Sequence, residues 1–223
     1  KIPGGKFYLC SISYDQSAKA IKFIATDSTL KKTWTTTLDE PSRSTLKCGW
    51  IQSTMPVDAD GDGVKESPHP VLIFVTEYNT YIYDPVTDET TIRVADISSE
   101  TPPDARKKNK DNVSYWKTNP RCTLIENHLG RTFYAGWKPF AQVELDHPLD
   151  DEQDQVYESM VNQNKRSFFT MPPHVFVWSD ELDPLGIPAN QILTIDPSET
   201  ITGLKSWQEQ LVIFTDRSIY TFT

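Results

Sequence analysis

The chain has few cysteines and no apolar run long enough to cross a membrane. Its three cysteines, Cys10, Cys48 and Cys122, lie far apart in a sequence of 223 residues. An odd number of widely spaced cysteines is a poor disulfide framework, so we expect free thiols and assembly in a reducing compartment. No stretch approaches the roughly 18 apolar residues that a membrane-spanning helix needs, and we therefore expect no membrane-spanning segment.

Sequence signatures of enzymes are missing as well. The sequence contains no Gly-x-Ser-x-Gly elbow, no phosphate-binding glycine loop and no Cys-x-x-Cys pair. Its four histidines are isolated, without the spacing that would offer zinc two nitrogens from one helix, and we expect surface or loop positions for them: His69, His128, His147 and His174. Carboxylates are abundant, but the sequence singles out no pair for glycoside hydrolysis. We therefore predict no catalytic residues and no enzymatic activity.

Positive charge is also scarce. The chain has 22 Lys and Arg against 31 Asp and Glu, which gives a formal net charge of −9. An acidic surface repels phosphate, so a protein that reads nucleic acid is disfavoured. The one basic cluster, residues 106–110, follows a proline-containing stretch and is typical of a solvated loop; a contact to an acidic partner is the alternative.

What the sequence does contain is a β-hairpin pattern that occurs twice. The segment Leu72–Tyr83 returns, with the same length, as Leu211–Phe222. Each copy has an apolar, β-branched and aromatic run, a short polar corner with an acidic residue, and a second run that ends in an aromatic residue. A hairpin cannot bury its own apolar face, so long-range repetition predicts similar sheets packed side by side.

Further segments fit the same unit and predict an all-β fold. Strand patterns cover residues 6–13, 20–25, 30–38, 122–126, 132–137, 175–180 and 201–207. The strands recur in clusters about 40 to 50 residues apart, which is the size of one propeller blade. We predict a single β-propeller, or part of one, with four-stranded blades over residues 1–223, and we expect the chain to be part of a longer one because it begins without Met.

Two polar segments interrupt the strands, at about residues 98–119 and 146–167. Within the second, several acidic residues are followed by apolar residues at helical spacing, so a short amphipathic helix can form there: Val156, Tyr157, Met160 and Val161. We interpret both segments as insertions between strands. Long insertions on a β scaffold are where contacts to partners usually occur.

The strongest chemical motif is the acidic loop at residues 58–66. Carboxylates at alternate positions, glycines that permit a tight turn, a backbone carbonyl and a closing acid together suit a hard cation, most simply Ca²⁺. The proposed ligands are Asp58, Asp60, Asp62, the Val64 carbonyl and Glu66. The loop is not an EF-hand, because His69 occupies the twelfth position; it resembles the calcium loops of FG-GAP propeller blades, although the next strand is delayed by residues 67–70. An unoccupied acidic turn is the alternative, and a bound ion would be structural, because all acids of the loop would be ligands.

Several segments in the second half carry a resemblance to a known family. They are Arg131–Gly136, Pro173–Asp180, Asp183–Leu185 and above all Ile201–Tyr220. In these segments, over about half of its length, the chain resembles the β-propeller structural proteins of tailed-bacteriophage tails, the nozzle or hub class that includes packaged-DNA stabilisation proteins. The resemblance implies a virion protein that is assembled in the host cytoplasm.

The resulting prediction is a structural component of a phage-type tail. The resemblance implies a homo-oligomeric ring that contacts other tail proteins and surrounds a channel through which DNA passes without sequence-specific binding. The alternative is an extracellular or periplasmic calcium-binding propeller that binds a carbohydrate or protein ligand. A propeller hydrolase has only the abundance of carboxylates in its favour.

Overall fold

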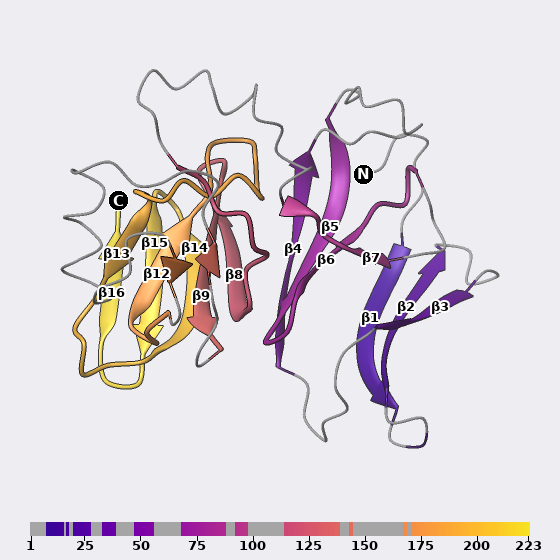
Figure 1. Cartoon of the computed structure of the whole chain (residues 1–223), viewed down its shortest axis with the longest axis horizontal. Helices are drawn as coiled ribbons and strands as arrows, with labels where there is room; N and C mark the ends of the chain where they lie inside the picture. The colour runs from indigo at the N-terminus through magenta and orange to yellow at the C-terminus, as the bar shows by residue number, and fades with distance from the viewer. Residues whose placement is uncertain are drawn as a thin grey trace.

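The protein is built from antiparallel β-sheets that follow one another along the chain (Figure 1). The computed structural model describes residues 8–15, 17, 20–27, 33–38, 47–55, 68–87, 92–97, 114–138, 143–144, 167–168 and 171–223. Every secondary-structure element named within these ranges is a strand. Among these residues, none belongs to a helix long and apolar enough to span a membrane.

Sheets 1 and 2 are meanders, in which each strand pairs with the next along the chain. Sheet 1 contains β1 (Tyr8–Asp15), β2 (Ala20–Asp27) and β3 (Thr33–Leu38) in the order β1-β2-β3. Sheet 2 has the order β4-β5-β6-β7 and contains β4 (Cys48–Met55), β5 (His69–Thr76), β6 (Thr80–Tyr83) and β7 (Ile92–Val94).

Sheets 3 and 4 continue the same plan. Sheet 3 has the order β13-β12-β9-β8 and contains β8 (Cys122–His128), β9 (Arg131–Trp137), β12 (Val175–Trp178) and β13 (Ile192–Thr194). A two-stranded ribbon of β10 (Val143–Glu144) and β11 (Ser167–Phe168) stands in the chain between β9 and β12. Sheet 4 contains β14 (Ile201–Trp207), β15 (Gln210–Thr215) and β16 (Ile219–Phe222) in that order.

A separate apolar core lies at each junction between successive sheets. Phe23 and Ala25 of sheet 1 pack on Phe74 and Tyr83 of sheet 2. The larger second core joins sheets 2 and 3 through buried residues such as Ile51, Ile73, Ile125, Tyr134, Val175 and Val177. The third joins sheets 3 and 4 through residues such as Phe133, Phe176, Leu211 and Ile213. Because the inner strands of sheets 2 and 3 are covered on both faces, β5, β9 and β12 contain continuous apolar runs instead of an alternation of apolar and polar residues.

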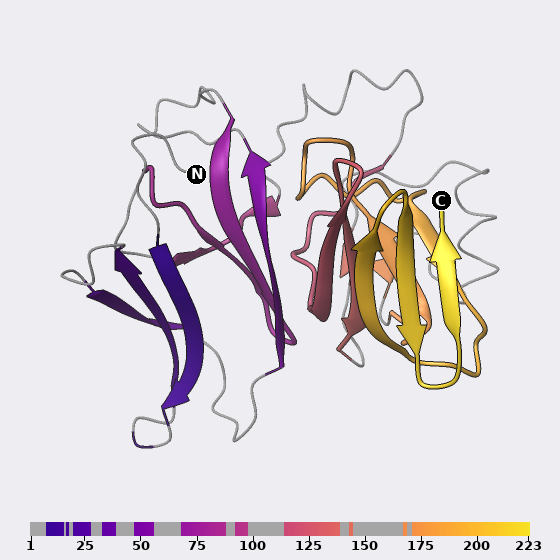
Figure 2. The same cartoon turned by 180° about the vertical axis from the view of Figure 1, so that it is seen from behind.

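The prediction of an all-β fold with repeated antiparallel four-stranded sheets is confirmed, whereas closure into a propeller is not observed. In both views, sheets 1 and 4 lie at opposite sides of the molecule (Figures 1 and 2). The first strands of sheets 2 to 4 are neighbours, since β8 contacts both β4 and β14. The described part of the chain is therefore an open series of packed sheets.

The duplicated hairpin occupies equivalent places in sheets 2 and 4, as the repeat predicts. Leu72 pairs with Tyr83 in one hairpin and Leu211 with Phe222 in the other, and both hairpins are the second and third strands of their sheets. The turns also match. In each, the backbone N–H of the last threonine of the first strand donates to the carbonyl three residues later: Thr76 to Asn79 at 2.9 Å and Thr215 to Ser218 at 3.0 Å.

The threonine hydroxyl stabilises each turn, and this gives a testable prediction. Oγ1 of Thr215 accepts the backbone N–H groups of Arg217 at 3.2 Å and Ser218 at 2.7 Å, and Thr76 makes the equivalent pair of bonds. We expect Thr215→Val to lower the free energy of unfolding by about 1–2 kcal/mol, because valine keeps the shape and removes the acceptor. Urea titration measures this loss. Thr215→Ser, which keeps a hydroxyl, is the control and should recover most of it; equal stability of the valine variant and the wild type would contradict the role of the hydroxyl.

Candidate functional site

The calcium-loop prediction concerns residues that lie outside the described part of the chain. Asp58, Asp60, Asp62, Val64 and Glu66 belong to the connection between β4 and β5. Elsewhere, among the described residues, no group of three or more His, Cys, Asp or Glu side chains could hold a metal ion. The calcium site therefore stays a prediction of the sequence.

A titration tests it directly. We expect the wild type to bind Ca²⁺ with measurable heat, and the double variant Asp60→Ala, Asp62→Ala to show none, because it lacks two of the carboxylate ligands. Chelation should lower the thermal midpoint of the wild type alone, since an ion that binds only the folded state stabilises it. Equal heats from both proteins would remove the site, and an unchanged midpoint after chelation would make any site dispensable for the fold.

Most of the two predicted insertions lies outside the described residues. This is true of residues 98–113 and of residues 146–166, which include the predicted amphipathic helix. The end of the first segment is described and belongs to the core. Tyr115 and Trp116 are each 2% exposed, and the ring centroids of Trp116 and Trp137 lie 5.5 Å apart. The polar segment therefore ends by residue 114, where buried residues of the second core begin.

Two histidines contradict the prediction of surface or loop positions. His69 and His128 are buried strand residues, 8% and 4% exposed. The Nε2 atom of His69 lies 2.9 Å from both carboxylate oxygens of Asp84, which also accepts the N–H of Val86 in the following turn. The register of the β5–β6 hairpin brings these residues together, and their hydrogen bonds join the start of β5 to the residue that follows β6.

His128 and Ser206 have the form of a base beside a hydroxyl nucleophile, but their surroundings do not suit catalysis. The Nδ1 atom of His128 lies 3.0 Å from Oγ of Ser206 and so connects sheet 3 to sheet 4. Among the described residues, the other ring nitrogen, Nε2, has no hydrogen-bond partner. A catalytic histidine of this type is oriented by an acid on that second nitrogen, and no described acid lies there.

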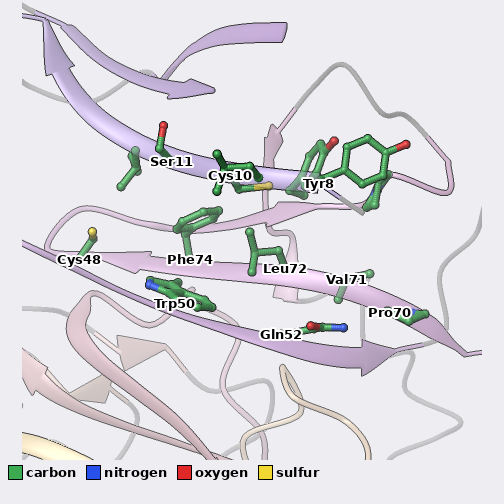
Figure 3. Close-up of a pocket in the computed structure, with 14 residues that line it drawn as sticks. Tyr8, Cys10, Ser11, Cys48, Trp50, Gln52, Pro70, Val71, Leu72 and Phe74 are labelled. Atoms are coloured by element: carbon green, nitrogen blue, oxygen red, sulfur yellow. The ribbon is translucent and has the colours of Figure 1, made fainter. Parts of the chain in front are cut away.

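Among the described residues, a largely apolar cleft with a few polar groups lies between sheet 1 and sheet 2 (Figure 3). Its volume is about 670 Å³, and its lining comes from β1 on one side and from β4 and β5 on the other. Sheet 1 covers the centre of sheet 2, where Phe74 is 3% exposed, but not the edge strand β4, where Trp50 is 62% exposed although the register pairs it with Phe74. The cleft lies over this uncovered edge. It is the candidate functional site, which sequence analysis missed because its two walls come from different sheets.

Polar and reactive groups in the cleft are few. Gln52 stands next to Trp50 on the same face of β4, and two cysteines, Cys10 and Cys48, lie on opposite walls. Neither of these cysteines, nor the buried Cys122, is part of a disulfide in the described structure. Burial raises the pKa of the Cys10 thiol to about 11. An aromatic platform with one amide suits binding of a small molecule better than it suits chemistry.

The raised pKa predicts slow alkylation of Cys10. Relative to an ordinary thiol with a pKa of 9.0, a pKa of about 11 lowers the thiolate fraction at pH 8 roughly a hundredfold. We expect iodoacetamide to modify Cys10 about that much more slowly in the folded chain than in urea, with a rate that rises up to about pH 11. Mass spectrometry of peptides measures both rates. Equal rates in the folded and unfolded chains would contradict the burial of this thiol.

The described tryptophan side chains differ in burial. Trp116 and Trp137 are buried, as expected for core residues, whereas Trp50 and Trp207 are 62% and 65% exposed. Trp207 is the last residue of β14 in sheet 4, and this sheet lies on the opposite side of the molecule from sheet 1 (Figure 2).

Comparison of the chain with protein-family models, with curated proteins and with solved structures finds no match in any of the three.

Proposed function

We propose that the chain is a structural protein of a phage-type tail that forms part of a ring-shaped channel and works through protein contacts. The observation that carries this proposal is the series of sheets with an apolar core at each junction. In such an array, most apolar side chains are buried between neighbouring sheets, and the array is a rigid scaffold. The resemblance of Ile201–Tyr220 to tail nozzle and hub proteins supports the same function.

The acidic composition suits a channel for DNA. A net charge of −9 repels phosphate, so DNA could pass without being held. Within the described residues, the polar clusters also support a structural role. For example, the buried carboxylate of Glu199 accepts hydrogen bonds from the hydroxyl groups of Thr215, Ser218 and Tyr220. These bonds stabilise the β15–β16 turn.

Light scattering and electron microscopy of the purified chain test the proposal. We expect a closed ring with a central opening, and in an infected host we expect the protein in purified particles. A chain that stays monomeric and is absent from particles would overturn the proposal.

The cleft favours a second candidate, the binding propeller that is the alternative prediction. Trp50 offers an exposed ring on which a sugar face can stack, and Gln52 offers an amide beside it. Titration of a glycan panel, followed by the fluorescence of the wild type and of Trp50→Ala, separates the two candidates. Saturable binding that Trp50→Ala removes would favour the binding protein, and no binding would remove this candidate.

A further inference from the structure

The cleft between sheets 1 and 2 has an uncharged lining. None of the 14 described residues that line it is Asp, Glu, Lys, Arg or His, although charged residues make up 24% of the chain. An ion that leaves water for such a lining finds no side chain of opposite charge, and this desolvation lowers its affinity. The chemistry of the cleft therefore favours uncharged ligands.

Trp50 is a preformed platform in this cleft. Its side chain is 62% exposed, whereas Phe74, its neighbour in the register, is 3% exposed. The strand that carries Trp50 is held on two sides, because it pairs with β5 along its whole length and Gly49 brings its backbone close to the Thr123 carbonyl of β8. A ring on a fixed strand has little backbone freedom to lose when a ligand binds, and flat aromatic rings stack on indole.

Gln52 offers one polar contact at a defined distance from Trp50. The two residues alternate along β4 and share a face, so their Cα atoms lie about 7 Å apart. The backbone carbonyl of Gln52 accepts the Asn127 amide, but its side-chain amide has no hydrogen-bond partner among the described residues. Because a primary amide can both donate and accept, it fits a neutral hydroxyl, amine or carbonyl group.

The lining suits an aromatic molecule better than a sugar. Each sugar ring carries several hydroxyl groups, which need hydrogen-bond partners when they leave water. Apart from Gln52 and two weakly polar thiols, the polar side chains of the lining are Tyr8, Ser11 and Tyr83, of which Tyr83 is 1% exposed. The other described lining residues are apolar.

We propose that the cleft binds an uncharged aromatic small molecule, with its ring stacked on Trp50 and one neutral polar group bound to Gln52. The volume of about 670 Å³ is within the range of sites for drug-sized ligands. Ile12 and Leu72, which are only partly buried, contact the rest of the molecule. This inference rests on the second candidate function, ligand binding, and replaces its sugar by an aromatic ligand.

Two dyes that differ by one charged group test the proposal. Phenylnaphthylamine is neutral and has a single N–H group, and its sulfonated analogue, anilinonaphthalene sulfonate, has the same rings and a negative charge. We expect saturable binding of the neutral dye to the wild type, measured by dye fluorescence, and at least about tenfold weaker binding of the sulfonate, because the lining offers no cation. Equal affinities, or no saturable binding of the neutral dye, would overturn the proposal.

Three variants test the assigned contacts. Trp50→Ala should weaken binding of the neutral dye at least about tenfold, whereas Trp207→Ala, at a tryptophan that is 65% exposed on sheet 4, should leave it unchanged. Gln52→Leu keeps the size of the side chain and removes the amide, so we expect a loss of about three- to tenfold. An unchanged affinity of Trp50→Ala overturns the proposal, and an unchanged affinity of Gln52→Leu overturns the polar contact.

Protection of Cys48 locates the dye. Cys48 lines the cleft on the same strand as Trp50. We expect saturating neutral dye to slow the alkylation of Cys48 by iodoacetamide at least about fivefold in the wild type, and not in Trp50→Ala. No protection in the wild type would place the dye elsewhere and overturn the proposal.

The glycan titration separates this inference from the candidate function on which it rests. A glycan that binds through Trp50, with no binding of the neutral dye, would keep a binding protein and overturn the aromatic ligand. If neither binds, the inference and the second candidate function both fail. Binding of the neutral dye that requires Trp50 and protects Cys48 is the expected result.

Discussion

Replacing Phe133 by alanine is expected to lower the free energy of unfolding by about 3–5 kcal/mol. Phe133 is 1% exposed at the centre of the junction between sheets 3 and 4. Its ring centroid lies 5.9 Å from that of Trp178 and 5.7 Å from that of Phe222, so the truncation leaves a cavity among large rings that cannot close it. Urea unfolding followed by circular dichroism measures the loss.

Phe214→Ala is the matched control, because it removes the same side chain from the face of sheet 4 that points away from sheet 3. Phe214 is 39% exposed, and we expect a loss of about 1 kcal/mol. Similar losses for the two variants would show that the junction between sheets 3 and 4 is not packed as described.

Replacing Gly49 by alanine is expected to separate β4 from β8 and to cost about 3 kcal/mol. A Cβ atom at this position would lie 2.8 Å from the carbonyl oxygen of Thr123 and 3.0 Å from Cγ2 of Ile125. The first of these is backbone, which cannot rotate away, so one sheet has to shift against the other. Thermal unfolding monitors the effect.

Gly203→Ala provides the control for Gly49→Ala. At Gly203 the nearest atom to an added Cβ is Cδ2 of Phe214 at 3.4 Å, an ordinary van der Waals contact. We expect a change within about 0.5 kcal/mol, with a small stabilisation because alanine restricts the unfolded chain. A loss at Gly203 as large as that at Gly49 would mean that loss of glycine in a strand, and not close approach of the sheets, is the cause.

Local patterns in the sequence were sufficient for most of the longer strands and their hairpins, but they did not predict β4 or the short strands β7, β10, β11 and β13. The duplicated run, with a threonine at the end of its first strand, specifies both the register and the turn, because hydrogen bonds of a hairpin and of its turn join residues close in sequence. The continuous apolar run of β5 also indicates burial on both faces, as observed in sheet 2. Sheet 4 has the same kind of apolar run in β15, but in the structure only one face of this sheet is covered.

The candidate site depended on contacts between residues far apart in the chain. No local pattern shows that sheet 1 leaves β4 uncovered, so the cleft beside Trp50 could not be predicted. The burial of His128 was equally hidden, because its partner Ser206 lies 78 residues away on another sheet.

The sequence by itself determined that the protein is all-β, where its hairpins turn, and that the same hairpin recurs at long range, because period-two patterns and turn residues act through neighbouring residues. Only the tertiary structure decided the order of sheets, the pairing of β12 with β9 across the intervening ribbon, the close approach at Gly49 and the uncovered face of sheet 4. These features arise from packing between separate sheets, where the free energy depends on which surfaces meet and not on the order of residues within a strand.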